Sequence, residues 1–180
     1  MTEASLRQIR RLSRWLQLGT TLAMLILPLV VTLGLAMALA DPYSLSQHFP
    51  GLPDGTILTR ATATVALMIG ASMLIPALFA LSQMRRLFSL YLAGEVLSPA
   101  CAAHIRRIGL SFVTLAGMGV LLPTLQILVL TATNPAGQRA LSIAISSDSI
   151  GFLLAGGLLT VIGHSMVEAA RAAEENAGFV

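Results

Sequence analysis

Four long runs without an acidic or basic residue constrain this chain more than any other feature. They cover residues 16–40, 61–84, 108–133 and 149–167, and His164 is the only ionisable group inside them. The first run has 25 residues, which as a helix rising about 1.5 Å per residue exceeds a hydrocarbon core of about 30 Å. The pattern predicts an all-α polytopic membrane protein with four transmembrane helices, forming one integral membrane domain over residues 1–180.

The composition excludes an ordinary soluble domain. Hydrophobic residues make up 56% of the chain and charged residues 11%, and the mean hydropathy is +0.83, far from the balance of a soluble globular protein. The eleven basic residues are all arginine, and with the abundant Ala and Leu this bias is typical of a GC-rich bacterial genome. We therefore predict a multi-pass protein of the bacterial cytoplasmic (inner) membrane.

The first run is also similar to a secretory signal, because Ala38-Leu39-Ala40 before Asp41 has the pattern of a cleavage site. Its apolar stretch is longer than the 7–15 residues typical of a signal peptide. We therefore expect this segment to be retained as a membrane anchor.

The positions of the arginines predict the orientation of the helices. Short cytoplasmic loops of membrane proteins are enriched in basic residues. Only Arg60 and Arg139 lie on one side of the predicted spans, and the other nine lie on the opposite side: Arg7, Arg10, Arg11, Arg14, Arg85, Arg86, Arg106, Arg107 and Arg171. Both termini are therefore predicted to lie in the cytoplasm.

The loop between the second and third runs contains signals for helix ends. Gly94 is a typical residue to end a helix, and Ser98 followed by Pro99 is typical of an N-cap and first helical position. We therefore expect the second and third helices to extend beyond the membrane as a cytoplasmic helical hairpin.

The same region resembles a known family. Arg86-Leu87-Phe88, Gly94-Glu95, Leu97-Ser98-Pro99 and Ile105-Arg106-Arg107-Ile108-Gly109 are similar to the central motif of a bacterial four-span family catalogued as domain of unknown function 2975. The chain departs from that pattern after Glu175-Asn176, where Ala177-Gly178-Phe179-Val180 replaces an expected Leu-Thr-Val. The resemblance implies the four-span topology and a link to small helix-turn-helix regulators, and it implies no catalytic residues.

Four residues offer a weak alternative as a metal site. Cys101 and His104 are three residues apart, and His164 and Glu168 are four apart, so each pair shares one helix face and offers donor types that Zn²⁺ accepts. Alanine-rich surroundings supply no supporting polar groups. We therefore expect neither a metal nor any other cofactor, and interpret these residues as polar groups near the interface.

Other polar and small residues have structural interpretations. Pro28, Pro76 and Pro123 are expected to shape their helices, and Asp148 is expected to cap the fourth one. Gly151 and Ala155 form a small-xxx-small step that favours close helix packing, within the chain or in a dimer.

The sequence favours a non-enzymatic adaptor or accessory protein. It contains no Ser-His-Asp arrangement, HExxH motif or phosphate loop. We predict a protein partner on the cytoplasmic face or within the membrane, contacts with membrane lipids and no direct nucleic-acid binding, and a homo-oligomer stays open. The predicted partner-binding residues are Arg85, Arg86, Glu95, Arg106 and Arg107, with Glu174 and Glu175 as a competing acidic tail. The alternative is a small oligomeric transporter or channel.

Overall fold

The computed structural model describes residues 3–41, 49, 51–53, 55–95, 98–135, 139 and 141–177. It leaves the side chains of residues 3–10, 170 and 172–177 undescribed. Every regular element among the described residues is a helix: α1 Glu3–Ala40, α2 Arg60–Ala71, α3 Leu74–Ala93, α4 Pro99–Leu130 and α5 Ser147–Ala177. The segments that are long and apolar enough to cross a membrane are Arg11–Ala40, Arg60–Ala93, Pro99–Leu130 and Ser147–Ala169. The all-α prediction with four such segments is confirmed.

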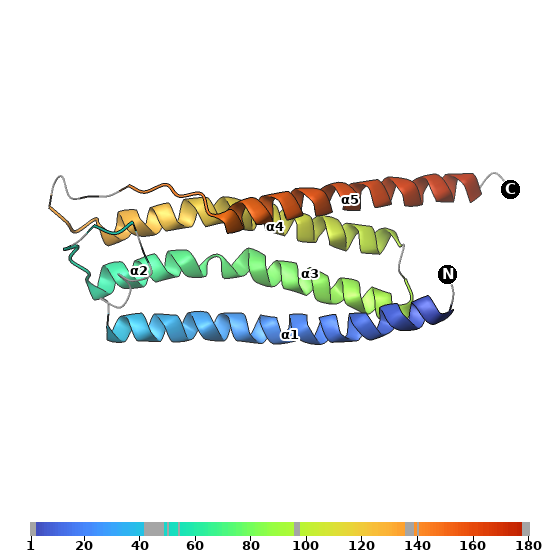
Figure 1. Cartoon of the computed structure of the whole chain (residues 1–180), viewed down its shortest axis with the longest axis horizontal. Coiled ribbons are helices and arrows are strands. Elements are labelled where there is room, and N and C mark those ends of the chain that lie inside the picture. The colour runs from blue at the N-terminus through green and yellow to red at the C-terminus, as the bar shows by residue number, and fades with distance from the viewer. Residues whose placement is uncertain are drawn as a thin grey trace.

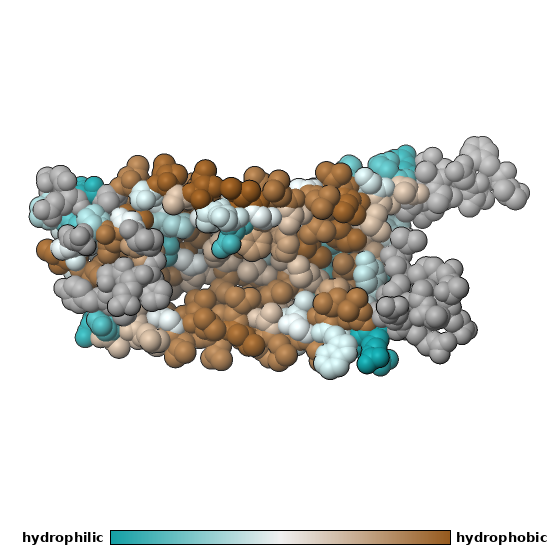
Figure 2. All heavy atoms as spheres, in the orientation of Figure 1, coloured by the Kyte–Doolittle hydropathy of each residue, from teal (hydrophilic) through white to brown (hydrophobic). Residues whose placement is uncertain are grey.

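The helices pack in a row instead of a closed bundle (Figure 1). α1 packs against α2 and α3, these pack against α4, and α4 packs against α5, whereas α1 and α5 make no comparable contact. The row leaves a broad apolar surface, with Leu25, Ile75 and Leu154 each about 70% exposed. Brown hydrophobic side chains fill the middle of the visible face (Figure 2). Exposed apolar area of this extent fits a lipid environment better than water.

The arginines gather at one end of the row, named here the arginine end. It consists of the start of α1, the end of α3, the start of α4 and the end of α5, and both chain termini lie there (Figure 1). The basic residues with described side chains at this end are Arg11, Arg14, Arg85, Arg86, Arg106, Arg107 and Arg171. Arg60 and Arg139 lie at the opposite end, as the four antiparallel segments require.

The connection at the arginine end follows the predicted helix signals. α3 ends at Ala93, and Gly94 adopts the left-handed conformation with φ of +93°, which is sterically inexpensive for glycine. The Ser98 side chain then accepts a hydrogen bond from the Cys101 backbone N–H at 3.3 Å, and Pro99 is the first residue of α4. The predicted helix ends at Gly94 and Ser98 are confirmed, and both helices continue past the uncharged runs towards this connection.

The second of the segments long and apolar enough to cross a membrane is interrupted, in contrast to the single helix expected. α2 ends at Ala71 and α3 begins at Leu74. Pro76 cannot donate to the carbonyl four residues earlier, that of Ser72, and this carbonyl instead accepts from the Ile75 N–H at 3.1 Å. Pro28 and Pro123 lie within continuous helices, so only one of the three prolines accompanies a break.

The third predicted span ends about three residues earlier than expected, because α4 ends at Leu130 and the prediction placed its end near residue 133. Its last predicted residues turn towards the segment that precedes α2. The Thr133 hydroxyl donates to the Ile57 carbonyl at 3.2 Å, and the Asn134 side-chain oxygen accepts from the Ile57 N–H at 3.3 Å. If α4 continued to residue 133, the side chains of Thr133 and Asn134 would point in other directions and could not make these two bonds.

Glycines allow α4 and α5 to approach closely. A Cβ atom added at Gly156 would lie 2.7 Å from the Gly109 carbonyl oxygen, and one at Gly163 would lie 2.8 Å from the Arg106 backbone nitrogen. Gly151 faces open space, so the predicted Gly151–Ala155 step does not form the seam between α4 and α5. The small residues do bring two helices together, but on a different face of α5.

The start of α5 lies beside the middle of α4. A Cβ atom at Gly119 would lie 2.7 Å from the Ser149 hydroxyl, so the first turn of α5 lies beside a point eleven residues, roughly 16 Å, before the end of α4. The cap is Ser146, whose hydroxyl accepts from the Ser149 N–H at 3.1 Å. The expected cap, Asp148, instead occupies the first turn, where its negative charge favours the helix dipole.

Candidate functional site

Four exposed arginines form a cluster at the arginine end. Arg85 and Arg86 lie in the last turns of α3, and Arg106 and Arg107 lie in the first part of α4. Within the described part of the chain, no carboxylate forms an ion pair with any of these four. The helical hairpin therefore concentrates positive charge where an anion can reach it.

The two arginines of α3 point to different sides of that helix. Arg86 lies seven residues after Phe79, so two helical turns place both on one face. Arg85 lies one turn before Ser89, whose hydroxyl accepts a hydrogen bond from the Gln17 side chain of α1 at 3.1 Å. Arg86 also lies three residues after Gln83, whose side chain contacts His104 of α4, whereas Arg85 lies two residues after it, so Arg86 is on the side of α3 nearer α4 and Arg85 points away from α4.

The two arginines of α4 divide in the same way. Arg106 lies on the side that meets α5, because its backbone nitrogen and Cβ are the atoms that a Cβ at Gly163 would meet. Arg107 lies on the side that faces α3, where it lines a groove. Arg86 and Arg107 thus lie beside the interface between α3 and α4. Arg85 and Arg106 lie on the sides of these two helices that face away from that interface.

A polar pair, one side chain buried and the other half-buried, lies next to the arginines. The His104 Nδ1 atom of α4 lies 2.7 Å from the Gln83 Oε1 atom of α3. Because Oε1 can only accept, Nδ1 is the donor. Gln83 is 2% exposed, and the charges of both Arg86 and Arg107 act on His104. The polar pair therefore fixes α3 against α4 where these two arginines emerge.

The four residues considered as a metal site lie in separate surroundings. Cys101 is buried, and its Sγ–H donates to the Glu95 backbone carbonyl at 2.8 Å, while His104 is bonded to Gln83. His164 and Glu168 are exposed on α5. No group of three or more His, Cys, Asp or Glu side chains suited to a metal occurs among the described residues.

The remaining predicted partner-binding residue, Glu95, lies just after the Gly94 turn. Its side chain is exposed, while its backbone N–H donates to the Leu90 carbonyl at 3.0 Å. The side chain is therefore available to a partner, at the tip of the hairpin and apart from the α3–α4 groove. Glu174 and Glu175 lie outside the residues with described side chains.

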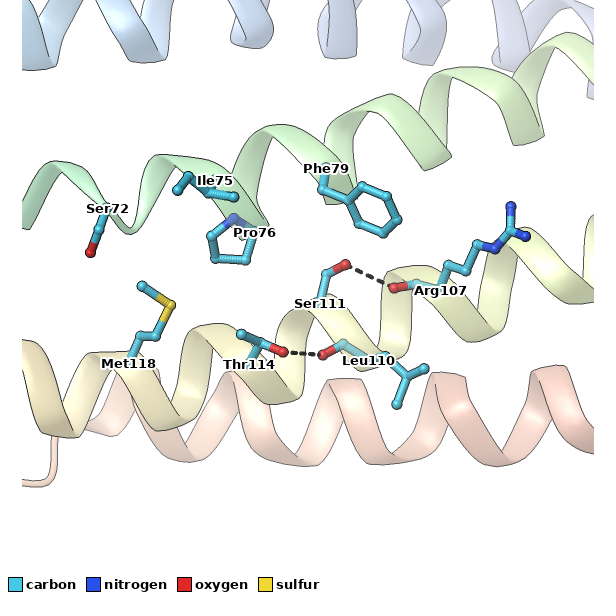
Figure 3. Close-up of a pocket in the computed structure, with 9 residues that line it drawn as sticks. All are labelled: Ser72, Ile75, Pro76, Phe79, Arg107, Leu110, Ser111, Thr114 and Met118. Carbon is cyan, nitrogen blue, oxygen red and sulfur yellow. Dashed lines mark hydrogen bonds between the residues drawn. The ribbon is translucent and has the colours of Figure 1, made fainter.

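A groove runs between α3 and α4 from the arginine cluster towards the α2–α3 break (Figure 3). Its volume is about 550 Å³, within the range of ligand-binding pockets. The Ser111 and Thr114 hydroxyls donate to their own helix, to the Arg107 and Leu110 carbonyls at 2.8 and 2.9 Å. The groove is therefore apolar along its length. Its lining residues are Ser72, Ile75, Pro76, Phe79, Arg107, Leu110, Ser111, Thr114 and Met118.

A second groove, of about 520 Å³, is bordered by residues of α1 to α5. It contains no charged lining residue, and Phe112 of α4 meets Phe152 of α5 edge to face beside it, with ring centroids 5.4 Å apart. Neither groove was predicted from the sequence. One continuous helix face could have been recognised from the spacing of Arg107, Ser111, Thr114 and Met118. The sequence alone did not show that this face lies against α3.

Comparisons with protein-family models, with curated proteins and with solved structures find no match. The resemblance to the four-span family therefore stays a prediction that rests on the motifs of the sequence.

Proposed function

We propose that this chain is a non-enzymatic adaptor of the bacterial inner membrane that binds an acidic segment of a protein partner. The observation that supports the proposal is the cluster of Arg85, Arg86, Arg106 and Arg107, exposed on two packed helices and without a carboxylate partner among the described residues. In the proposed orientation this cluster faces the cytoplasm, as the positive-inside rule favours.

The chemistry of the cluster suits a carboxylate-rich ligand. A guanidinium group binds a carboxylate with two parallel hydrogen bonds, and hydrogen bonds to charged groups each contribute about 1.5–3 kcal/mol. Glu95 at the tip of the hairpin adds one negative charge beside the positive ones. A partner with an acidic segment followed by a basic residue would complement this pattern.

The resemblance to the four-span family suggests one class of partner, a small helix-turn-helix regulator held at the membrane. The second class is a larger membrane complex of which this chain is an accessory subunit. The two versions differ in what accompanies the purified chain: a soluble DNA-binding protein in the first, and integral membrane proteins in fixed ratio in the second.

The test is purification from the native membrane in mild detergent, followed by mass spectrometry of proteins recovered in stoichiometric amounts. Reversing the four arginines to glutamate should abolish recovery of the partner, while reversing Arg60 and Arg139 at the opposite end should not. A reporter fused to each terminus must show that the orientation is unchanged. Full recovery with all four arginines reversed and the topology intact would refute the proposal.

One observation supports the transporter or channel alternative. Interrupted helices are common where transporters bind their substrates, and the α2–α3 break lies inside a membrane-crossing segment. Near it, Gln126 of α4 donates to the Ala66 carbonyl of α2 at 2.9 Å. Reconstitution into vesicles tests this alternative, because a transporter would change the permeability of the membrane without any protein partner.

A further inference from the structure

The groove between α3 and α4 has the length of one leaflet of a bilayer. On α4 its lining extends from Arg107 to Met118, eleven residues or roughly 16 Å of helix. This is about half of a hydrocarbon core of about 30 Å. A chain that enters beside Arg107 would thus end near the middle of the membrane, at the level of the α2–α3 break.

The lining of the groove is suited to a hydrocarbon chain. Ile75, Pro76, Phe79, Leu110 and Met118 supply apolar surface, and the hydroxyls of Ser111 and Thr114 are already bonded to their own helix. A polar ligand would find no free donor along the inner part of the groove. Apolar surface of this kind is best covered by a ligand that is itself apolar.

The mouth of the groove carries the opposite chemistry. Arg107 lines the groove at its arginine end, and its guanidinium group points away from the apolar part (Figure 3). Arg86 lies on the same face of α3 as Ile75 and Phe79, by helical spacing of seven and eleven residues. Two guanidinium groups therefore lie at the level where a lipid phosphate would sit if an acyl chain filled the groove.

We infer that this groove binds one anionic glycerophospholipid, with an acyl chain between α3 and α4 and the phosphate held by Arg107 and Arg86. Arginine binds phosphate oxygens with paired hydrogen bonds, and basic residues at a membrane surface attract anionic lipids. This inference does not rest on the proposed protein partner. Arg85 and Arg106, on the outer sides of the hairpin, stay free to bind a protein while lipid occupies the groove.

The experiment is native mass spectrometry of the detergent-purified full chain with added phosphatidylglycerol or phosphatidylcholine of identical acyl chains. The wild type should retain phosphatidylglycerol preferentially. Substituting Arg86→Gln with Arg107→Gln should weaken that retention about tenfold or more, since two arginine contacts are lost. The matched control, Arg85→Gln with Arg106→Gln, removes the same charge from the same two helices and should retain the lipid. Equal loss in both double variants would overturn the inference.

A second variant tests the acyl chain separately from the headgroup. Thr114→Trp places a bulky side chain in the groove, whereas Leu121→Trp changes an exposed residue of α4 outside the groove lining. Only Thr114→Trp should reduce phosphatidylglycerol retention. Equal retention by both would overturn the inference, as would competition by inorganic phosphate as strong as that by the lipid. A dimer of the chain that Thr114→Trp dissociates, without lipid retention in the wild type, would assign the groove to a second copy instead.

Discussion

Gln83 of α3 and His104 of α4 are 21 residues apart in the chain, and their side chains meet at 2.7 Å between Oε1 and Nδ1. Gln83 is 2% exposed, so water cannot easily replace a lost partner. The pair lies where the helical hairpin leaves the apolar part of the row, beside Arg86 and Arg107. Its geometry therefore determines how the arginine cluster and the mouth of the groove are placed.

Gln83→Leu should destabilise the chain by about 0.5–1.5 kcal/mol, because the half-buried His104 would lose its hydrogen-bond acceptor. The double variant Gln83→Leu with His104→Leu should recover much of the loss, since it removes both polar groups. Thermal unfolding in one detergent measures both. A double variant less stable than the single one would show that the hydrogen bond is not the source of the effect.

The seam between α4 and α5 should distinguish two adjacent glycines. Gly156→Ala should destabilise the chain, because its Cβ would lie 2.7 Å from the Gly109 carbonyl oxygen, whereas Gly157→Ala meets nothing within 4 Å. The second change should be neutral or stabilising by up to about 1 kcal/mol, the difference in helix propensity. Thermal midpoints of the two variants decide this, and equal destabilisation by both would contradict the packing of α4 on α5.

Gly70 and Gln126 should be energetically coupled. A Cβ atom at Gly70 would lie 2.5 Å from the Gln126 side-chain nitrogen, which donates to the Ala66 carbonyl at 2.9 Å. Gly70→Ala should therefore destabilise the wild type more than it destabilises a Gln126→Ala background. A double-mutant cycle of thermal stabilities gives the coupling, expected at about 0.5–3 kcal/mol for contacting residues. Strict additivity would indicate that α2 and α4 are not in this register.

The arginine end should lie in the cytoplasm. Fusions of a reporter that is active only in the cytoplasm should be active at either terminus and after Gly94, and inactive when inserted beside Arg139. The physical reason is the excess of arginine in the short segments at the arginine end. Activity of the insertion beside Arg139, with silence at the termini, would establish the reverse orientation.

Local chemistry determined the parts of the fold that the sequence predicted well. Uncharged length alone located the four helical segments that are apolar enough to cross a membrane. The ends of the hairpin at Gly94 and Ser98 depend on backbone conformation and on a bond to a residue three positions away. The exposure of Arg85, Arg86, Arg106 and Arg107 was also predictable, because charged side chains at the ends of apolar helices avoid hydrocarbon.

The tertiary structure decided the features that depend on how each helix is rotated and how far it is shifted along its neighbour. The rotation of α5 about its axis turns Gly156 and Gly163 towards α4 and leaves Gly151 away from it. The rotations of α3 and α4 place Arg86 and Arg107 beside the groove and direct Arg85 and Arg106 away from it. The shift of α5 placed Ser146 at its start in place of Asp148. The period and length of the apolar pattern in the sequence determine neither the rotation of a helix nor its shift along its neighbour. Both depend on which side chains of the two helices fit together.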